Sequence, residues 1–216
     1  MIKLASFTFN PFQENTYVLW DKTMECIIVD PGCYDRNQEN ELATFIKDNK
    51  LKPVQVVNTH CHIDHVFGNA FCVNTYKIPL YFHQLEDQVL AAAQGSAALY
   101  GLQYTESPEA DFYLVEGERV FFGDSSLSIR FTPGHSPGSI SLVAAKEKFV
   151  LGGDVLFQGS IGRTDLPGGD LDTLLTSIRK EMLSLPDDYT VYSGHGLSTT
   201  IGAERHSNPY LNSKVH

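Results

Sequence analysis

Apolar residues in the first 60 positions form short runs that polar and turn-forming residues separate. Each run has the length of a strand, and an Asp-Pro-Gly turn signal follows the third. Leu42, Phe45 and Ile46 lie at helical spacing in the segment after that turn. The pattern predicts strands at residues 2–9, 15–19, 25–29 and 54–57, and a helix over residues 36–50 that ends before Pro53.

The rest of the chain continues this alternation of helix-like and strand-like segments. Its least regular part is residues 96–111, where we expect an irregular excursion near the functional site and leave its role open. The pattern predicts helices at residues 67–76, 84–98, 171–185 (with Asp170 as N-cap) and 201–206, and strands at 78–82, 120–122, 127–131, 139–143, 148–151 and 190–192. The four strands between residues 120 and 151 are expected in a second sheet. Periodicity by itself therefore indicates mixed layers of helix and sheet.

Length and charge narrow the picture further. A chain of 216 residues suits a single domain, so we expect one domain over residues 1–216. The net charge of −10, without any run of Lys or Arg, argues against a nucleic-acid partner. No apolar stretch approaches the roughly 20 residues of a membrane span, and no secretion signal is recognisable. We therefore expect a cytoplasmic protein without a membrane partner, with its four cysteines as free thiols.

Candidate metal ligands gather at residues 59–65, which read Thr-His-Cys-His-Ile-Asp-His. His60, His62, Asp64 and His65 carry the imidazole and carboxylate groups that bind zinc, iron and manganese. A solvated polar loop or a histidine tract is the simpler alternative, but a tract would be contiguous. Because such groups are costly to bury unpaired, the cluster predicts a metal site. Cys61 is a further possible ligand, although its place in the motif normally points away.

Three later residues stand in similar settings after strand-like runs. His135 lies within Thr-Pro-Gly-His-Ser-Pro-Gly, a tight loop, and His195 lies between two glycines. Asp154 follows two glycines at the end of an apolar run. Glycine lets the backbone approach an ion closely, so each setting suits a ligand. The alternative readings are a turn histidine and a turn-starting carboxylate.

The His-x-His-x-Asp-His motif, together with these three residues, resembles the metallo-β-lactamase superfamily over nearly the whole chain. The resemblance implies an α/β fold: a four-layer αββα sandwich of two mixed sheets flanked by helices. It also implies two divalent metal ions, with zinc expected and iron or manganese as alternatives, and a bridging hydroxide that attacks the substrate. Asp64 and Asp154 are then catalytic as well as metal ligands. The implied ligands are His60, His62 and His135 for the first ion, Asp64, His65 and His195 for the second, and Asp154 as the bridge.

The segment after Asp154 narrows the resemblance to one branch. Its Gly-Arg-Thr-Asp string and the Leu-Pro-Gly-Gly-Asp that follows resemble the short glyoxalase II-like, or hydroxyacylglutathione hydrolase-like, hydrolases. The implied substrate is a small-molecule thioester such as S-lactoylglutathione. Arg163 is expected to bind a substrate carboxylate, to pair with Asp165 or Asp170, or to do both in turn. No added C-terminal glutathione-binding domain is expected, which leaves the thiol moiety open.

Other functions remain open alongside thioester hydrolysis. A mononuclear iron persulfide dioxygenase would use His60, His135 and Asp154, although those enzymes usually have Phe where this chain has Leu166. A broad-specificity hydrolase of another ester or amide, a lactamase and a non-catalytic metal-binding module are the further alternatives. Metal count and oxygen uptake separate hydrolysis from dioxygenation. The oligomeric state is left open.

Overall fold

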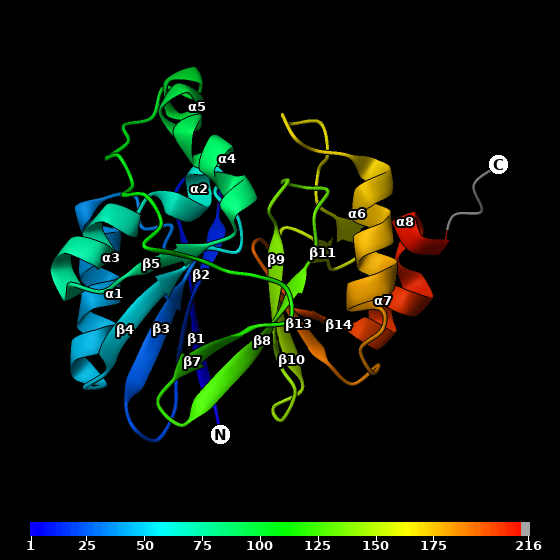
Figure 1. The fold of residues 1–216 in the computed structure, drawn as a ribbon, viewed down its shortest axis with the longest axis horizontal. Coiled ribbons are helices and arrows are strands. Elements are labelled where there is room, and N and C mark those ends of the chain that lie inside the picture. The colour runs from blue at the N-terminus through cyan, green and yellow to red at the C-terminus, as the bar shows by residue number, and fades with distance from the viewer. Residues whose placement is uncertain (213–216) are drawn as a thin grey trace.

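Two mixed sheets pack face to face in the computed structural model, which describes residues 1–212 (Figure 1). The first sheet has the strand order β1-β2-β3-β4-β5-β6. β1 to β3 are antiparallel, and the pairs from β3 to β6 are parallel. Its strands are β1 (Lys3–Phe9), β2 (Glu14–Trp20), β3 (Glu25–Val29), β4 (Lys52–Val57), β5 (Leu80–Phe82) and β6 (Phe112–Tyr113).

The second sheet has the order β14-β13-β10-β9-β8-β7, in which only β10 and β13 run parallel. A separate hairpin of β11 and β12 follows Asp154. The strands are β7 (Arg119–Phe122), β8 (Ser125–Phe131), β9 (Ile140–Ala144), β10 (Phe149–Gly153), β11 (Leu156–Phe157), β12 (Ser160–Ile161), β13 (Thr190–Ser193) and β14 (Thr199–Thr200).

Helices cover the outer face of each sheet, so the predicted αββα sandwich is confirmed (Figure 1). α1 and α3 lie outside the first sheet and α6 and α7 outside the second, whereas α2, α4 and α5 lie along one edge. The helices are α1 (Arg36–Asp48), α2 (Ile63–Val66), α3 (Asn69–Tyr76), α4 (Asp87–Ala91), α5 (Ala93–Leu99), α6 (Leu171–Ser177), α7 (Ile201–Ser207) and α8 (Pro209–Asn212), with a 3₁₀ turn at Gln84–Glu86 and a π-helical turn at Ile178–Met182.

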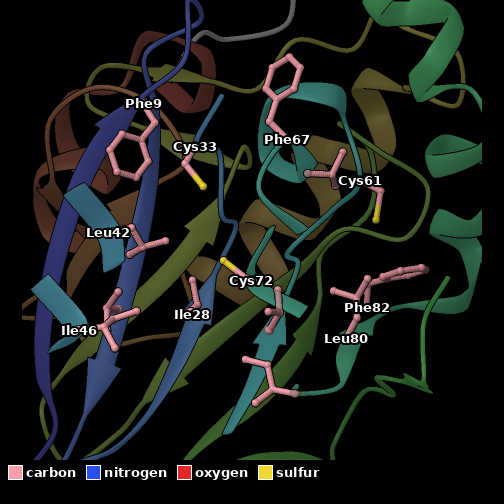
Figure 2. Close-up of a cluster of buried hydrophobic side chains, with 14 of the residues drawn as sticks. Phe9, Ile28, Cys33, Leu42, Ile46, Cys61, Phe67, Cys72, Leu80 and Phe82 are labelled. Carbon is pink, nitrogen blue, oxygen red and sulfur yellow. The ribbon is translucent and has the colours of Figure 1, made fainter. Parts of the chain in front are cut away.

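Strand alternation explains why both faces of the first sheet are apolar. On β3, Ile27 belongs to the core between the two sheets, and its neighbour Ile28 faces the core beneath α1. Leu42 and Ile46 of α1 belong to the same core as Ile28, on the outer side of the first sheet (Figure 2). Complete burial of such a side chain contributes roughly 1.5–3 kcal/mol. A strand buried on both faces reads as a continuous apolar run, which is the pattern the sequence shows.

Several predicted boundaries are wrong in detail. The helix expected at 84–98 is a 3₁₀ turn followed by α4 and α5, which meet at Ala92, and the helix expected at 67–76 is preceded by α2 and begins only after Gly68. The helix expected at 171–185 turns π-helical after Ser177 and ends at Met182. Residues 96–111 include the end of α5, and no regular element covers residues 100–111. Asp170 does cap α6, where its side chain accepts a hydrogen bond from the Thr173 backbone.

Within residues 1–212, no helix combines the length and the hydrophobicity that crossing a bilayer requires.

Candidate metal centre

All seven predicted ligands lie at one edge of the two sheets. The His60–His65 motif follows the end of β4 and runs into α2, the short helix labelled below α4 and α5 in Figure 1. His135 follows β8, Asp154 follows β10, and His195 follows β13. Because these strands end at the same side of the sandwich, residues 130 positions apart in the chain meet there. The structure therefore brings together all seven residues that the resemblance implied as metal ligands.

His60, His62 and His135 form the first group, with one ligand atom from each lying within 4.8 Å of the others. His135 Nε2 lies 3.2 Å from His60 Nε2 and 2.9 Å from His62 Nδ1. His60 is completely buried and His135 is 2% exposed. Three ring nitrogens thus converge on one point, where His62 is half-buried and His60 and His135 are buried.

Hydrogen bonds from the surrounding chain fix which nitrogen of each ring faces that point. His135 Nδ1 lies 2.7 Å from the Arg163 carbonyl oxygen, which can only accept, so Nδ1 carries the proton. The Thr59 hydroxyl donates to Asp30 Oδ2, so its oxygen accepts from His60 Nδ1 at 3.2 Å. Both Nε2 atoms are then unprotonated, and their lone pairs face each other at 3.2 Å. Such a pair repels unless a cation lies between, and a metal ion fits that requirement.

Asp64, His65 and His195 form the second group, whose ligand atoms also lie within 4.8 Å of one another. Asp64 Oδ2 lies 3.0 Å from His195 Nε2 and 3.8 Å from His65 Nε2. His65 is completely buried, and neither of its ring nitrogens makes a hydrogen bond. A buried imidazole without a hydrogen bond is costly, and an ion at Nε2 would remove that cost on one side of the ring.

Asp154 lies between the two groups. Its Oδ2 is 3.6 Å from His135 Nε2, and its Oδ1 is 3.6 Å from His65 Nε2 and 3.0 Å from His195 Nδ1. Gly194 makes room for this carboxylate, because a Cβ at that position would lie 2.2 Å from Asp154 Oδ1. One carboxylate is therefore placed to serve both groups.

Burial and charge set the protonation of the two groups in opposite directions. Burial holds the pKa of His60 well below its usual range and lowers that of His62 to about 3, so both rings are neutral and can act as ligands. Burial alone would raise the pKa of Asp154, but His65 and His195 outweigh it and hold that pKa well below normal. The first group therefore offers neutral imidazoles and Asp154 offers an ionised carboxylate, the forms that metal ions bind. Burial opposes a charge on His65 and His195, but Asp64 and Asp154 outweigh it and raise the pKa of both rings, that of His195 to about 9, so an ion bound at the second group would displace a proton from each ring.

Two buried carboxylates behind the second group were missed by the sequence analysis. Asp30 Oδ2 lies 3.2 Å from His65 Nδ1, and Asp30 also accepts hydrogen bonds from the backbone and hydroxyl of Thr59. Glu14 Oε1 lies 4.0 Å from the same His65 nitrogen. Their position behind a ligand matches the carboxylates that orient metal-binding histidines. In the sequence Asp30 reads as part of a turn, and Glu14 stands just before the strand expected at residues 15–19.

Glu86 connects the two loops that carry the first group, and it was also missed. This buried side chain accepts hydrogen bonds from the Cys61 backbone at 2.7 Å, the Ser136 hydroxyl at 2.6 Å and the Gly138 backbone at 2.6 Å. Cys61 stands between His60 and His62, and Ser136 follows His135. One carboxylate therefore fixes the backbone beside all three ligands of the first group.

Cys61 itself faces away from the ligand atoms. It belongs to the apolar core around Phe82 and lies in none of the ligand groups found in residues 1–212 (Figure 2). Burial holds the pKa of its thiol well above the usual value, so it stays protonated. A protonated thiol is a poor metal ligand and a poor nucleophile.

Arg163 lies beside the centre and forms one of the ion pairs expected for it. Its guanidinium pairs with Asp165 through Nε and Nη2, each at 2.7 Å from a carboxylate oxygen. Asp170 instead caps α6. Arg163 also borders a cleft of about 550 Å³. The same cleft is lined by five of the proposed ligands, namely His62, Asp64, His135, Asp154 and His195. Pairing with Asp165 is thus observed, and binding of a substrate carboxylate stays a prediction.

Comparison with known proteins points to one family. The model of the metallo-beta-lactamase superfamily matches residues 9–195. The probable metallo-hydrolase YqgX of Bacillus subtilis is 42% identical over 98% of both chains. The hydroxyacylglutathione hydrolase GloC of Haemophilus influenzae is 36% identical over 94% of this chain and 95% of its own.

Two solved structures are similar throughout. The BLEG-1 B3 metallo-beta-lactamase has a TM-score of 0.90 and 40% identity, and the match covers 98% of this chain and 100% of that one. TTHA1623 in a di-iron-bound form has a TM-score of 0.87 and 35% identity, covering 96% of this chain and 100% of that one.

Proposed function

The chain belongs to the metallo-beta-lactamase superfamily and is a metallo-hydrolase by family, and from this premise we propose that it is a binuclear hydrolase of thioesters. The observation that carries the binuclear part is the position of Asp154, whose two carboxylate oxygens reach both ligand groups. His60, His62 and His135 would hold one ion, and Asp64, His65 and His195 the other, with Asp154 shared.

The ions would supply a hydroxide at neutral pH and polarise the carbonyl of the substrate when bound. The chain itself contributes the arrangement of the groups around them. The Arg163 carbonyl holds His135 in the tautomer that presents Nε2, and Asp30 faces the back of His65. The cleft of about 550 Å³ over the ligands leaves room for a substrate carbonyl at the same point. No protein nucleophile is required, which agrees with the buried, protonated Cys61.

Two likenesses support a thioester as the substrate. The relative GloC is a hydroxyacylglutathione hydrolase by name, at 36% identity over almost the whole chain. The Gly-Arg-Thr-Asp string that resembles the glyoxalase II branch lies at the cleft, where Arg163 borders the ligands. The metal is proposed as zinc, with iron or manganese as alternatives. The similar structure in a di-iron-bound form supports iron among these.

A persulfide dioxygenase is the second candidate, because His60, His135 and Asp154 alone would form its two-histidine, one-carboxylate set. His135 Nε2 lies 3.2 Å from His60 Nε2 and 3.6 Å from Asp154 Oδ2, so the three groups do meet. The complete second group argues for hydrolysis, since a mononuclear enzyme has no use for Asp64, His65 and His195 as ligands.

The deciding experiment is metal content per chain in protein purified without chelator, measured beside three activities. The activities are hydrolysis of S-lactoylglutathione, hydrolysis of a β-lactam, and oxygen consumption with glutathione persulfide. Two ions per chain with thioester turnover are the expected result. One iron with oxygen uptake and no hydrolysis would replace the proposal with dioxygenation, and turnover of the β-lactam alone would replace it with lactam hydrolysis.

A further inference from the structure

An uncharged branch leads off the cleft above the candidate metal centre. The branch has a volume of about 260 Å³ and lies beside the main cleft of about 550 Å³. The two cavities share His62, Ile63, Ser96, Leu166 and Pro167 in their walls. Since His62 is also a proposed ligand, the two cavities adjoin each other next to the centre.

The walls of the branch are apolar on both sides. Helices α4 and α5 contribute Val89, Ala92 and Ala93, and the facing loops contribute Leu166 and Pro167. Among the described residues that line the branch, none is Asp, Glu, Lys or Arg, although the chain as a whole carries a net charge of −10. An apolar cavity joined to a polar centre is the usual arrangement of a small-molecule site, in which apolar walls bind and a few polar groups orient.

The rim of the main cleft also carries large apolar side chains. Leu99 is 83% exposed and Tyr100 is 48% exposed, and the Tyr100 ring packs edge-on against Phe12 at 5.1 Å. Arg163 is the one Lys or Arg among the described residues that line either cavity, and Asp165 already pairs with it. The two cavities therefore offer large apolar surface and little free positive charge to a substrate.

We propose that the branch binds an apolar arm of the substrate, a hydrocarbon group attached on either the acyl side or the thiol side of the thioester. This inference rests on the proposed hydrolase function and names the substrate class of the same site. Each methylene that moves from water into such a cavity improves binding about fourfold, the equivalent of ~0.8 kcal/mol. The branch therefore makes this chain a hydrolase that prefers thioesters with a hydrocarbon arm to short, charged ones.

Two substrate series test the proposal and identify the side. The first keeps glutathione and lengthens the acyl group from acetyl to butyryl to hexanoyl. The second keeps lactate and lengthens the thiol from methane- to butane- to hexanethiol. We expect kcat/KM to rise by about fourfold per methylene in one of the two series. Thioester turnover that is independent of length in both series would overturn the branch proposal and leave the hydrolase proposal standing, whereas no thioester turnover by fully metal-loaded protein would overturn the hydrolase proposal.

Two neighbouring alanines provide a matched pair of variants. Ala92 lines the branch, whereas Ala91, one residue earlier and equally exposed, borders a different depression of the surface. Ala92→Asp places a charge in the apolar wall and should lower kcat/KM for the longest substrate at least tenfold, while Ala91→Asp should leave it unchanged. Ser96→Phe, which fills the junction of the two cavities, should act like Ala92→Asp. Equal length dependence in wild type and in both branch variants would overturn the proposal.

Discussion

Single side chains outside the motif decide how well the metal centre is held. Glu86 illustrates this, since it contacts no ligand ring but accepts hydrogen bonds from the backbone of Cys61 and Gly138 and from the Ser136 hydroxyl. Its burial alone would raise its pKa, and hydrogen bonds from the two loops oppose that without reversing it. Its environment is built for an acceptor, because all three partners donate. We therefore regard Glu86 as a positioning residue for the first ligand group.

Replacing Glu86 with Gln should weaken the first metal site specifically. The amide nitrogen cannot accept a hydrogen bond, so one of the two loops loses its attachment while the shape of the side chain is kept. We expect metal affinity at the first site to fall 10–100-fold, as is common for groups that orient ligands. Calorimetric titration of the metal-free protein would show one strong and one weakened site.

Asp87→Asn is the matched control, because Asp87 lies one residue further on and its side chain accepts a bond only from the exposed Tyr113 hydroxyl. It should bind two ions normally. Two unchanged sites in the Glu86→Gln protein would contradict the positioning role, and an equal loss at both sites would indicate a general loss of stability instead.

Arg163 offers a second prediction at this scale, because its backbone and its side chain have separate roles. Arg163→Ala keeps the carbonyl that fixes His135, so metal content should stay at the wild-type value. The ion pair with Asp165 is exposed and is worth about 0–1 kcal/mol, so the melting temperature should change little. We expect KM to rise about tenfold for a substrate with a carboxylate and to stay constant for a neutral one. A fall in metal content, or equal effects on both substrates, would contradict this separation.

At the scale of elements, the sequence predicts the helices and strands in which apolar residues recur at a regular spacing. It misses the elements that are too short to show such a spacing. The long strands and α1 were predicted because apolar residues recur along them, whereas β6, β11, β12 and β14 are two residues long and cannot show a period. The helix expected at 84–98 divides where no Gly or Pro marks the point, at Ala92. Glu86 was assigned to that helix although its side chain is turned into the core between loops. Contacts between distant segments decide these features, and local sequence does not encode them.

The Asp21 carboxylate connects the hairpin after β2 in the first sheet to the β7–β8 hairpin in the second. Asp21, after β2, accepts hydrogen bonds from the hydroxyl and backbone of Thr23, and also from the Asp124 backbone and the Ser125 hydroxyl in the turn between β7 and β8. Burial would raise the pKa of Asp21, but these hydrogen bonds outweigh it and lower the pKa to about 2. The ionised form of Asp21 is therefore the form that connects the sheets.

Asp21→Asn should destabilise the fold, and the effect should depend on pH in a defined direction. The folded pKa of about 2 lies below the unfolded value of about 3.9, so the contribution of Asp21 is complete above about pH 4 and is lost as the pH falls through about 2. We expect a loss of ~1–3 kcal/mol near pH 6, because two of the four donors lose their acceptor and the other two keep only a neutral one. Urea unfolding of wild type and variant, both metal-free, at pH 6, 4 and 3 measures the difference.

Asp124→Asn is the control for that series. The Asp124 side chain pairs only with Lys22 at the surface, and its backbone donor to Asp21 is kept. It should cost less than ~1 kcal/mol at every pH, as is usual for an exposed ion pair. A difference between wild type and Asp21→Asn that grows as the pH falls would show that the sign of the shift is wrong.

At the scale of the whole molecule, the seven proposed ligands come from both sheets. They meet at one edge of the sandwich, where a shared metal centre would connect the two sheets. The sequence analysis found these ligands because each stands in a motif or beside glycines, and it missed Glu14, Asp30 and Glu86 because an isolated carboxylate carries no pattern. Glu14 begins β2 and Asp30 follows β3, yet both face the same buried His65. The ligands could thus be predicted one by one, but the supporting carboxylates become visible only when the sheets are packed.

Metal removal should accordingly destabilise the entire fold and not just the centre. Without ions, the facing Nε2 atoms of His60 and His135 repel, and the buried His65 ring keeps no hydrogen bond. Ions present at 1,000 times their dissociation constant stabilise the folded chain by about 4 kcal/mol, which corresponds to roughly 10 °C in melting temperature for a chain of this size. Scanning calorimetry before and after dialysis against a chelator, with zinc added back, measures the change. If the melting temperature were unaffected by removal and readdition, the two ligand groups would not hold metal ions, and the common edge of the sheets would owe its stability to hydrogen bonds alone.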